Sequence, residues 1–285
     1  MIKVSIIYYL KEISSKTEKF LENISYQTLK DIEIILLYKK ENLPCKRFCK
    51  AFPNKIKAYE INGKTSDVLK FGISKAEGEC IIFMYHYDLP VLDMCKNMYQ
   101  KITEEESDAV SCDIQKIGSR YTLIKMPPFK TNILYDCLDN KMFKKEVFEN
   151  IEEIEVEKTD SVILGYLLPK INKISKINMP LINVDFTSKE EENLEDIEKD
   201  LEKLYDKMCE KYPKEIEYIY FMTIYNYIDS KIKNKNLNKK DMQKAKELIS
   251  SKFPNIKENE FIKKEAIQTN LNPFIMKVHH IFGGK

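Results

Sequence analysis

A cluster of aromatic and polar side chains stands where a buried strand should end. In "GECIIFMYHYDLP" (78–90), an apolar run leads directly into Tyr85, His86, Tyr87 and Asp88. Open α/β sheets place ligand-binding groups at the carboxyl ends of their strands, so these four side chains are candidates for a binding or catalytic site. A carboxylate there would hold a metal ion, tyrosine rings would stack on a base or a sugar, and an imidazolium would offset phosphate charge.

The elements that would position this cluster alternate along the first half of the chain. Strands are expected at 3–10, 31–38, 55–61, 79–88 and 108–114, with helices at 14–29, 65–78 and 90–102. The first two strands are almost continuously apolar, as parallel strands covered by helices on both faces should be. Strands that alternate with helices indicate a doubly wound α/β sheet. Gly78 would end the second helix in the left-handed conformation.

From Thr187 onward the pattern changes to amphipathic helices. Apolar residues recur at three- and four-residue spacing over 194–208 and 216–228, and 239–253 forms a third helix. These helices need a surface to pack on. We therefore expect an α/β domain at 1–186, followed by a C-terminal α-helical region at 187–285.

Composition and charge exclude several other classes of protein. Lys and Arg total 47 against 45 Asp and Glu, so a net charge of +2 gives no indication of nucleic-acid binding. Seven cysteines without a signal peptide indicate reduced thiols rather than a disulfide framework. No apolar run reaches membrane-spanning length. We expect a cytoplasmic protein, in which 273–285 either contacts the inner face of the membrane peripherally or packs on the domain.

Several segments, taken in order, resemble glycosyltransferase family 2. "FLENISYQTLKDIEIILL" resembles that family's "QTL-x-DIEIIxV" segment, and "GISKAEGECIIFM" its "GI-x-x-A-x-GEYI-x-FL" segment. "DNKMFKKEVFE" (139–149) is similar to "NKLFKREL", and "TDSVILGYLLPKINKISKINMPLINVD" (159–185) to the "ED-x-x-F…PLYxY" block. The resemblance implies a GT-A-type (Rossmann-like) mixed sheet flanked by helices. It also implies a bacterial protein of surface-glycan or glycoprotein assembly, in a family that transfers sugars from nucleotide sugars to acceptor hydroxyls.

The donor side departs from the family pattern at four places. The family's fourth strand ends "FLDSDD", so Tyr85 and Tyr87 replace its two metal-binding aspartates and Asp88 is what remains. After the second strand, where the family has "VDDGS", this sequence has "LYKKEN", which includes Tyr38. The first strand ends at Tyr8 and its neighbours, without the Pro-containing turn that is typical of the family. Before the fourth strand, "VLK" stands in place of the family's "ARN". Stabilising a diphosphate leaving group is an electrostatic task. The resemblance therefore implies an eroded metal and nucleotide-sugar site.

Three further residues match functional positions of the family. Asp160 falls where the family carries its catalytic base, with capping of the following helix as the alternative role. Asn140 and Lys141 fall on the segment beside the acceptor cleft. Mg²⁺ or Mn²⁺ would bind only if Asp88, together with Asp93, rebuilt a metal site, so no cofactor is expected.

Two functions remain open at this point. In the first, Tyr85, His86 and Tyr87 fill an unused site in a non-catalytic pseudo-transferase, which binds a glycan or partners another glycosyltransferase subunit or a second copy. In the second, they form a replacement donor site in an active, metal-independent transferase, with a nucleotide sugar, a glycan acceptor and Asp160 as base. The loss of both metal and nucleotide motifs favours the first function.

Overall fold

The computed structural model describes residues 1–10, 17–39, 49–50, 52, 55–85, 88–116, 122–124, 138–151, 154–157, 159–184, 193–233 and 235–263. The chain forms two compact units. The first consists of Met1–Met126, Cys137–Ile154 and Leu167–Glu190, and the second includes Glu155–Tyr166 and Glu191–Lys285. The predicted domain boundary at 186 stays a prediction.

A mixed sheet forms the centre of the first unit. Its strands, in the part of the chain that the structure describes, are β1 Val4–Leu10, β2 Ile32–Tyr38, β3 Ile56–Glu60, β4 Cys80–Tyr85, β5 Asp88–Pro90, β6 Ala109–Lys116, β7 Thr122–Ile124, β8 Lys141–Lys144 and β9 Ile174–Val184. Their order is β3-β2-β1-β4-β8-β6-β9-β5, with β7 beside β6. The first four strands are parallel, and β8 is antiparallel to both β4 and β6. The predicted mixed α/β sheet is confirmed.

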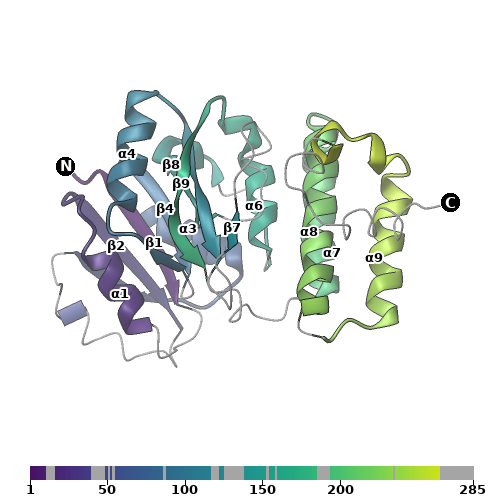
Figure 1. The fold of residues 1–285 in the computed structure, drawn as a ribbon, viewed down its shortest axis with the longest axis horizontal. Coiled ribbons are helices and arrows are strands. Elements are labelled where there is room, and N and C mark those ends of the chain that lie inside the picture. Colours follow the sequence, from purple (N-terminus) through teal and green to yellow (C-terminus); the bar gives the residue numbers. More distant parts are fainter. Residues whose placement is uncertain are drawn as a thin grey trace. The chain divides into compact units, whose positions relative to one another are not determined.

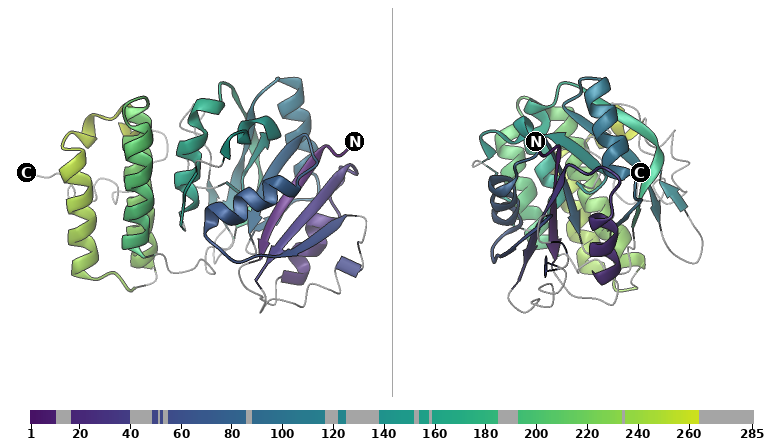
Figure 2. Two further views of the ribbon diagram at one scale, coloured as in Figure 1. Left: turned by 180° about the vertical axis from the view of Figure 1, so that it is seen from behind. Right: turned by 90° about the vertical axis from the view of Figure 1, so that its left-hand side faces the viewer.

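Helices cover both faces of this sheet. Those of the first unit are α1 Thr17–Ser25, α3 Thr65–Lys75 and α4 Met94–Glu104, with the short 3-10 helices η2 Lys145–Phe148 and η4 Leu168–Lys170. Helices α1 and α4 lie over one face (Figure 1), and α3 lies over the other, which the reversed view of Figure 2 shows. Alternation along β1 explains this arrangement. Tyr8 stacks on Phe20 of α1, with ring centroids 4.4 Å apart, while Ile7 faces Gly72 of α3.

Gly78 is required for close packing and not for a left-handed turn. Helix α3 ends at Lys75, Ala76 is extended with φ −72°, and Gly63 is the glycine with positive φ among the described residues. A Cβ atom on Gly78 would lie 2.6 Å from the backbone nitrogen of Ser5. The predicted left-handed helix stop at Gly78 is therefore wrong. This position needs a glycine because a larger side chain would collide with the backbone of β1.

The second unit is helical. It contains α6 Asp160–Leu167, α7 Leu194–Met208, α8 Pro213–Lys233, α9 Lys239–Lys252 and the 3-10 helix η6 Ile256–Glu258. The side chains of Asn193 and Asn238 cap α7 and α9, accepting hydrogen bonds from backbone N–H groups at 3.1 and 2.8 Å. The predicted C-terminal helical region is confirmed. Among the described helices, none combines the length and the apolar character needed to cross a membrane.

Candidate functional site

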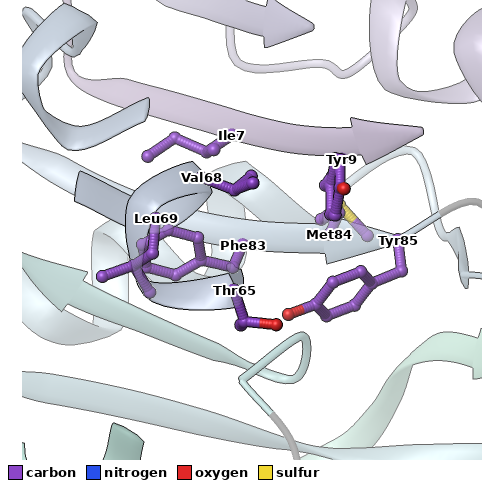
Figure 3. Close-up of a pocket in the computed structure, with 8 residues that line it drawn as sticks. All are labelled: Ile7, Tyr9, Thr65, Val68, Leu69, Phe83, Met84 and Tyr85. Atoms are coloured by element: carbon purple, nitrogen blue, oxygen red, sulfur yellow. The ribbon is translucent and has the colours of Figure 1, made fainter. Parts of the chain in front are cut away.

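The carboxyl ends of β1 and β4 border a pocket against α3 (Figure 3). Its lining residues are Ile7, Tyr9, Thr65, Val68, Leu69, Phe83, Met84 and Tyr85. Tyr9 and Tyr85 are register partners on neighbouring parallel strands, so they stand side by side on one face of the sheet. The space open to the centre of a water molecule is about 20 Å³, room for roughly one water.

The two tyrosines line this pocket and are themselves largely buried. Tyr9 is 8% exposed and Tyr85 is 7% exposed. The Tyr85 ring reaches toward Thr65 at the start of α3, as Figure 3 shows. The polar side-chain groups of the lining are uncharged hydroxyls, and Val68 and Leu69 supply the α3 wall. A diphosphate moved from water into such surroundings would lose its hydration without gaining an opposite charge.

Tyr8 and Tyr38 lie on the opposite face of the sheet from this pocket. Tyr8 alternates with Tyr9 and stacks on α1. Tyr38 ends β2 as the register partner of Leu10, which also alternates with Tyr9. The structure therefore brings neither residue together with Tyr85, although all three lie in the carboxyl-terminal halves of neighbouring strands.

The described residues at this edge do not fit a divalent cation. Mg²⁺ and Mn²⁺ prefer carboxylate oxygens, and β4 offers the phenol of Tyr85. Asp93 accepts a hydrogen bond from the hydroxyl of Thr28 at 2.6 Å. Within the described ranges, no three His, Cys, Asp or Glu side chains are grouped to hold a metal ion. The other members of the predicted cluster lie outside the described residues: His86, Tyr87 and the side chain of Asp88.

Asn140 and Lys141, predicted beside the acceptor cleft, are both fully buried. Asn140 Nδ2 donates to the backbone oxygen of Cys112 at 2.8 Å, and Lys141 Nζ donates to Asn140 Oδ1 at 2.8 Å. Burial also raises the pKa of Cys112 to about 12, so this thiol stays protonated at neutral pH and is a poor nucleophile. The predicted acceptor-side role of the two residues stays a prediction.

Asp160 is the first residue of α6, and its side chain lies outside the described part of the chain. The backbone that leads into α6 is held by Asp200 of α7. The two carboxylate oxygens of Asp200 accept hydrogen bonds from the N–H groups of Glu157, at 2.8 Å, and Thr159, at 3.0 Å. The hydroxyl of Thr159 has no hydrogen-bond partner among the described residues. Thr159 therefore does not cap α6 with its side chain. Instead, the buried carboxylate of Asp200, on α7, accepts hydrogen bonds from the backbone just before α6.

Three residues of these arrangements are not among the site residues that the sequence predicts: Tyr9, Thr65 and Asp200. Tyr9 and Tyr8 are adjacent, so alternation predicts that only one of them faces α3, but choosing between them requires the packing of α1 against β1. Asp200 is separated by 41 residues from Thr159. No local pattern in the sequence signals this pairing.

The chain has the fold of several glycosyltransferases of known structure. It superposes on S. aureus TarS with a TM-score of 0.62 at 13% identity, covering 93% of this chain and 55% of that chain. TarS 1-349 in complex with UDP-GlcNAc gives a TM-score of 0.58 at 14% identity, with 97% and 76% covered. The mannosyltransferase PcManGT from Pyrobaculum calidifontis, in complex with GDP-Man and Mn²⁺, gives 0.58 at 13% identity, with 98% and 84% covered.

These similarities confirm the predicted GT-A-type fold. The sequence matches no protein-family model and no curated protein sequence. At such low identity, the likeness establishes the fold alone. The chain spans 55% of the length of full TarS, the first of these neighbours.

Proposed function

We propose that this chain is a non-catalytic GT-A-fold protein of glycan assembly, which binds a glycan or partners an active glycosyltransferase. The observation that supports this most directly is the small pocket lined by Tyr9 and Tyr85, whose described polar groups are uncharged hydroxyls. Neighbours of the same fold are known in complex with UDP-GlcNAc or with GDP-Man and Mn²⁺. Such donors need charge at the diphosphate, because leaving-group stabilisation is electrostatic. The described lining of the pocket, made of uncharged hydroxyls and apolar side chains, does not supply it.

The proposal is tested by thermal unfolding in the presence of UDP-, GDP- and CDP-linked sugars, with and without Mn²⁺. A ligand at a hundred times its Kd would add about 2.7 kcal/mol to the free energy of unfolding. We expect no nucleotide sugar to raise the melting temperature. Metal-dependent stabilisation, or release of sugar from any donor, would contradict the proposal.

The variant Tyr85→Ala distinguishes two possible roles of this ring: packing in the pocket and stacking on a donor. If Tyr85 only fills the pocket, its truncation lowers the free energy of unfolding by about 3 kcal/mol and changes no donor response. If Tyr85 stacks on a donor, wild type responds to that donor and the variant does not. We expect the first result, read from denaturant unfolding and the same donor titration.

An active, metal-independent transferase is the second candidate function. The observation that favours it is the fully buried side chain of Lys141 on β8, the strand that pairs with β4. In that case Asp160 would act as base, and Asp160→Asn would abolish sugar transfer. If Asp160→Asn still transfers sugar, Asp160 is not the catalytic base.

The partner role has a separate test. Co-purification of the full chain with an active glycosyltransferase supports it, whereas a monomer that turns over donor by itself contradicts it. The cytoplasmic location stays a prediction, and so does peripheral membrane contact through 273–285. That segment lies outside the described residues.

A further inference from the structure

A lysine-rich turn joins helices α8 and α9 in the second unit (Figure 1). The ten residues 231–240, KIKNKNLNKK, contain five lysines and no aspartate or glutamate. Lys235 lies in the turn between the two helices, and Lys239 and Lys240 are the first two residues of α9. All three of these side chains are exposed. Together they form a cluster of positive charge, the α8–α9 tip.

The lysines of the tip differ from two lysines further along α9, which pair with α7. Lys244 lies 2.6 Å from Glu198, and Lys252 lies 2.7 Å from Glu202. In the part of the chain that the structure describes, no carboxylate forms an ion pair with a lysine of the tip. The charge of the tip is therefore not offset by ion pairs among the described residues.

The first turn of α7 is acidic and lies toward the same end of the unit, because α9 pairs with α7 in chain order. Its carboxylates act on other lysines. Asp196 lies 3.9 Å from Lys199. The pKa of Lys244 is raised by its hydrogen bond with Glu198 and by the charges of Glu198 and Glu195. These acidic groups thus leave the tip to face a partner outside the chain.

Local structure does not favour lysine at the tip. Lys235 has φ +57°, the left-handed conformation in which helix ends prefer glycine or asparagine. Lys239 and Lys240 stand in the first turn of α9, where the helix dipole disfavours positive side chains. Positions at which a residue conflicts with its local structure are commonly functional. The folding of these helices therefore does not explain the charge, and binding to an anionic partner does.

Half-buried apolar side chains lie among these lysines, at Ile232 and Leu237. Lysines interspersed with apolar residues suit the surface of a bilayer, where ammonium groups meet anionic headgroups and apolar groups meet the acyl boundary. The segment 231–240 has no arginine and no aromatic residue, the types that stack on nucleic-acid bases. Its chemistry therefore favours anionic lipid over nucleic acid.

We propose that the α8–α9 tip docks on the anionic headgroups of a lipid bilayer, with Lys235, Lys239 and Lys240 as the charged contacts and Leu237 between them. This surface is distinct from 273–285, the segment for which peripheral contact is predicted from the sequence. Docking through the tip is independent of the proposed function, because it requires neither glycan binding nor catalysis.

The test is sedimentation of the full chain with vesicles of phosphatidylcholine, alone or mixed with phosphatidylglycerol. Wild type should bind the anionic vesicles and not the neutral ones, and added salt should weaken the binding because it screens charge. A variant that combines Lys235→Gln, Lys239→Gln and Lys240→Gln should bind about a hundredfold more weakly. Each lysine near an anionic surface contributes roughly fivefold to such binding.

The matched control combines Lys19→Gln, Lys96→Gln and Lys211→Gln. These three lysines are also exposed, so the control loses the same charge while the tip stays intact. It should bind anionic vesicles as wild type does. Both triple variants should melt close to the temperature of wild type, because they replace exposed side chains.

A fluorescence readout reports on the tip itself. The chain contains no tryptophan, so Leu237→Trp introduces a single one among the lysines. Its emission should shift to shorter wavelength when anionic vesicles are added. Tyr212→Trp, next to the first residue of α8 and thus at the other end of that helix, should show no shift.

Several outcomes would overturn the proposal. These are equal binding of the two triple variants to anionic vesicles, equal binding of wild type to neutral and anionic vesicles, and binding of RNA but of no vesicle. An unshifted emission of Leu237→Trp in protein that sediments with vesicles would also overturn it. Turnover of a nucleotide sugar would overturn the proposed non-catalytic function and leave docking through the tip unaffected.

Discussion

Tyr9 and Tyr85 show how residue type at a strand end decides what a sheet edge can bind. Each ring buries a large apolar area and presents one uncharged hydroxyl. A carboxylate at either position would need a cation or several hydrogen-bond donors to offset its desolvation. The tyrosines need neither, and their largely buried rings line the pocket between β4 and α3. The same backbone positions therefore favour packing over the binding of a charged ligand.

Gly78 gives a prediction at the scale of one atom. In Gly78→Ala the new Cβ would meet the Ser5 backbone nitrogen at 2.6 Å, and backbone in a central strand cannot move away. We expect a loss of about 3 kcal/mol in the free energy of unfolding, measured by urea titration.

Gly72→Ala is the graded control for this prediction. Its Cβ would also come within 2.6 Å of another atom, but that atom is the Ile7 Cγ2 methyl group, which can shift. Alanine also favours the helix by about 1 kcal/mol. Equal losses in the two variants would contradict the explanation by backbone contact.

At the scale of elements, α7 holds the start of α6. Asp200 is fully buried and accepts from the backbone N–H groups of both Glu157 and Thr159. Helix α6 also packs closely, since a Cβ on Gly165 would lie 2.7 Å from Leu204 of α7. The place where Asp160 begins the helix is thus set by contacts within the second unit.

Asp200→Ala should release this segment. Two backbone N–H groups, that of Glu157 partly buried and that of Thr159 buried, would lose their acceptor, and the free energy of unfolding should fall by about 3 kcal/mol. Hydrogen exchange at the amides of Glu157 and Thr159 should accelerate more than exchange at the amides of α7. Asp206→Ala, at an exposed position of the same helix, should stay within about 0.5 kcal/mol of wild type. Unchanged protection of both amides in Asp200→Ala would show that Asp200 does not hold them.

The elements differ in how far the sequence predicts them. β4 is a continuous apolar run, and β1 and β2 are nearly so, interrupted by Ser5 and Glu33; the predicted positions of these strands are confirmed. β5, β7 and β8 have three or four residues, too few to show a period. β9 contains Pro180 and pairs with β6 through shifts in register, which disturb alternation. These strands are fixed by partners far away in the chain and not by local pattern.

At the scale of the whole molecule, topology predicts where the site lies but not which side chains share it. Parallel strands that alternate with helices place ligand groups at one edge, and this rule predicts Tyr85 as a site residue. Pairing of Tyr9 with Tyr85 depends on the register of two strands from separate parts of the chain. If the pairing register of one strand shifted by one residue, its side chains would move to the other face of the sheet. Sequence alone therefore cannot assign Tyr8 and Tyr85 to opposite faces.

Glu33 connects distant parts of the first unit. Its carboxylate accepts from the Ser5 hydroxyl at 2.7 Å, from the Glu77 N–H at 2.6 Å and from Lys57 Nζ at 2.9 Å. Burial would raise the pKa of Glu33, but the hydrogen bonds from Glu77, Ser5 and Lys57 outweigh it, and the pKa lies below its ordinary value. Strands β1, β2 and β3 and the segment after α3 are thereby held by one side chain.

Lowering the pH should therefore reduce the stability of the first unit, because Glu33 becomes protonated. A carboxyl whose pKa is lower in the folded state adds stability that is complete above its unfolded pKa, and this stability is lost as pH falls through the folded pKa. Urea unfolding between about pH 6 and pH 3 should show wild type losing stability more steeply than Glu33→Gln, which has no proton to gain. At neutral pH the variant should be less stable by about 3 kcal/mol, because a charged buried acceptor is lost. Glu149→Gln, at an exposed position, should follow wild type. Parallel pH profiles for wild type and Glu33→Gln would mean that this carboxylate does not connect the sheet as its contacts indicate.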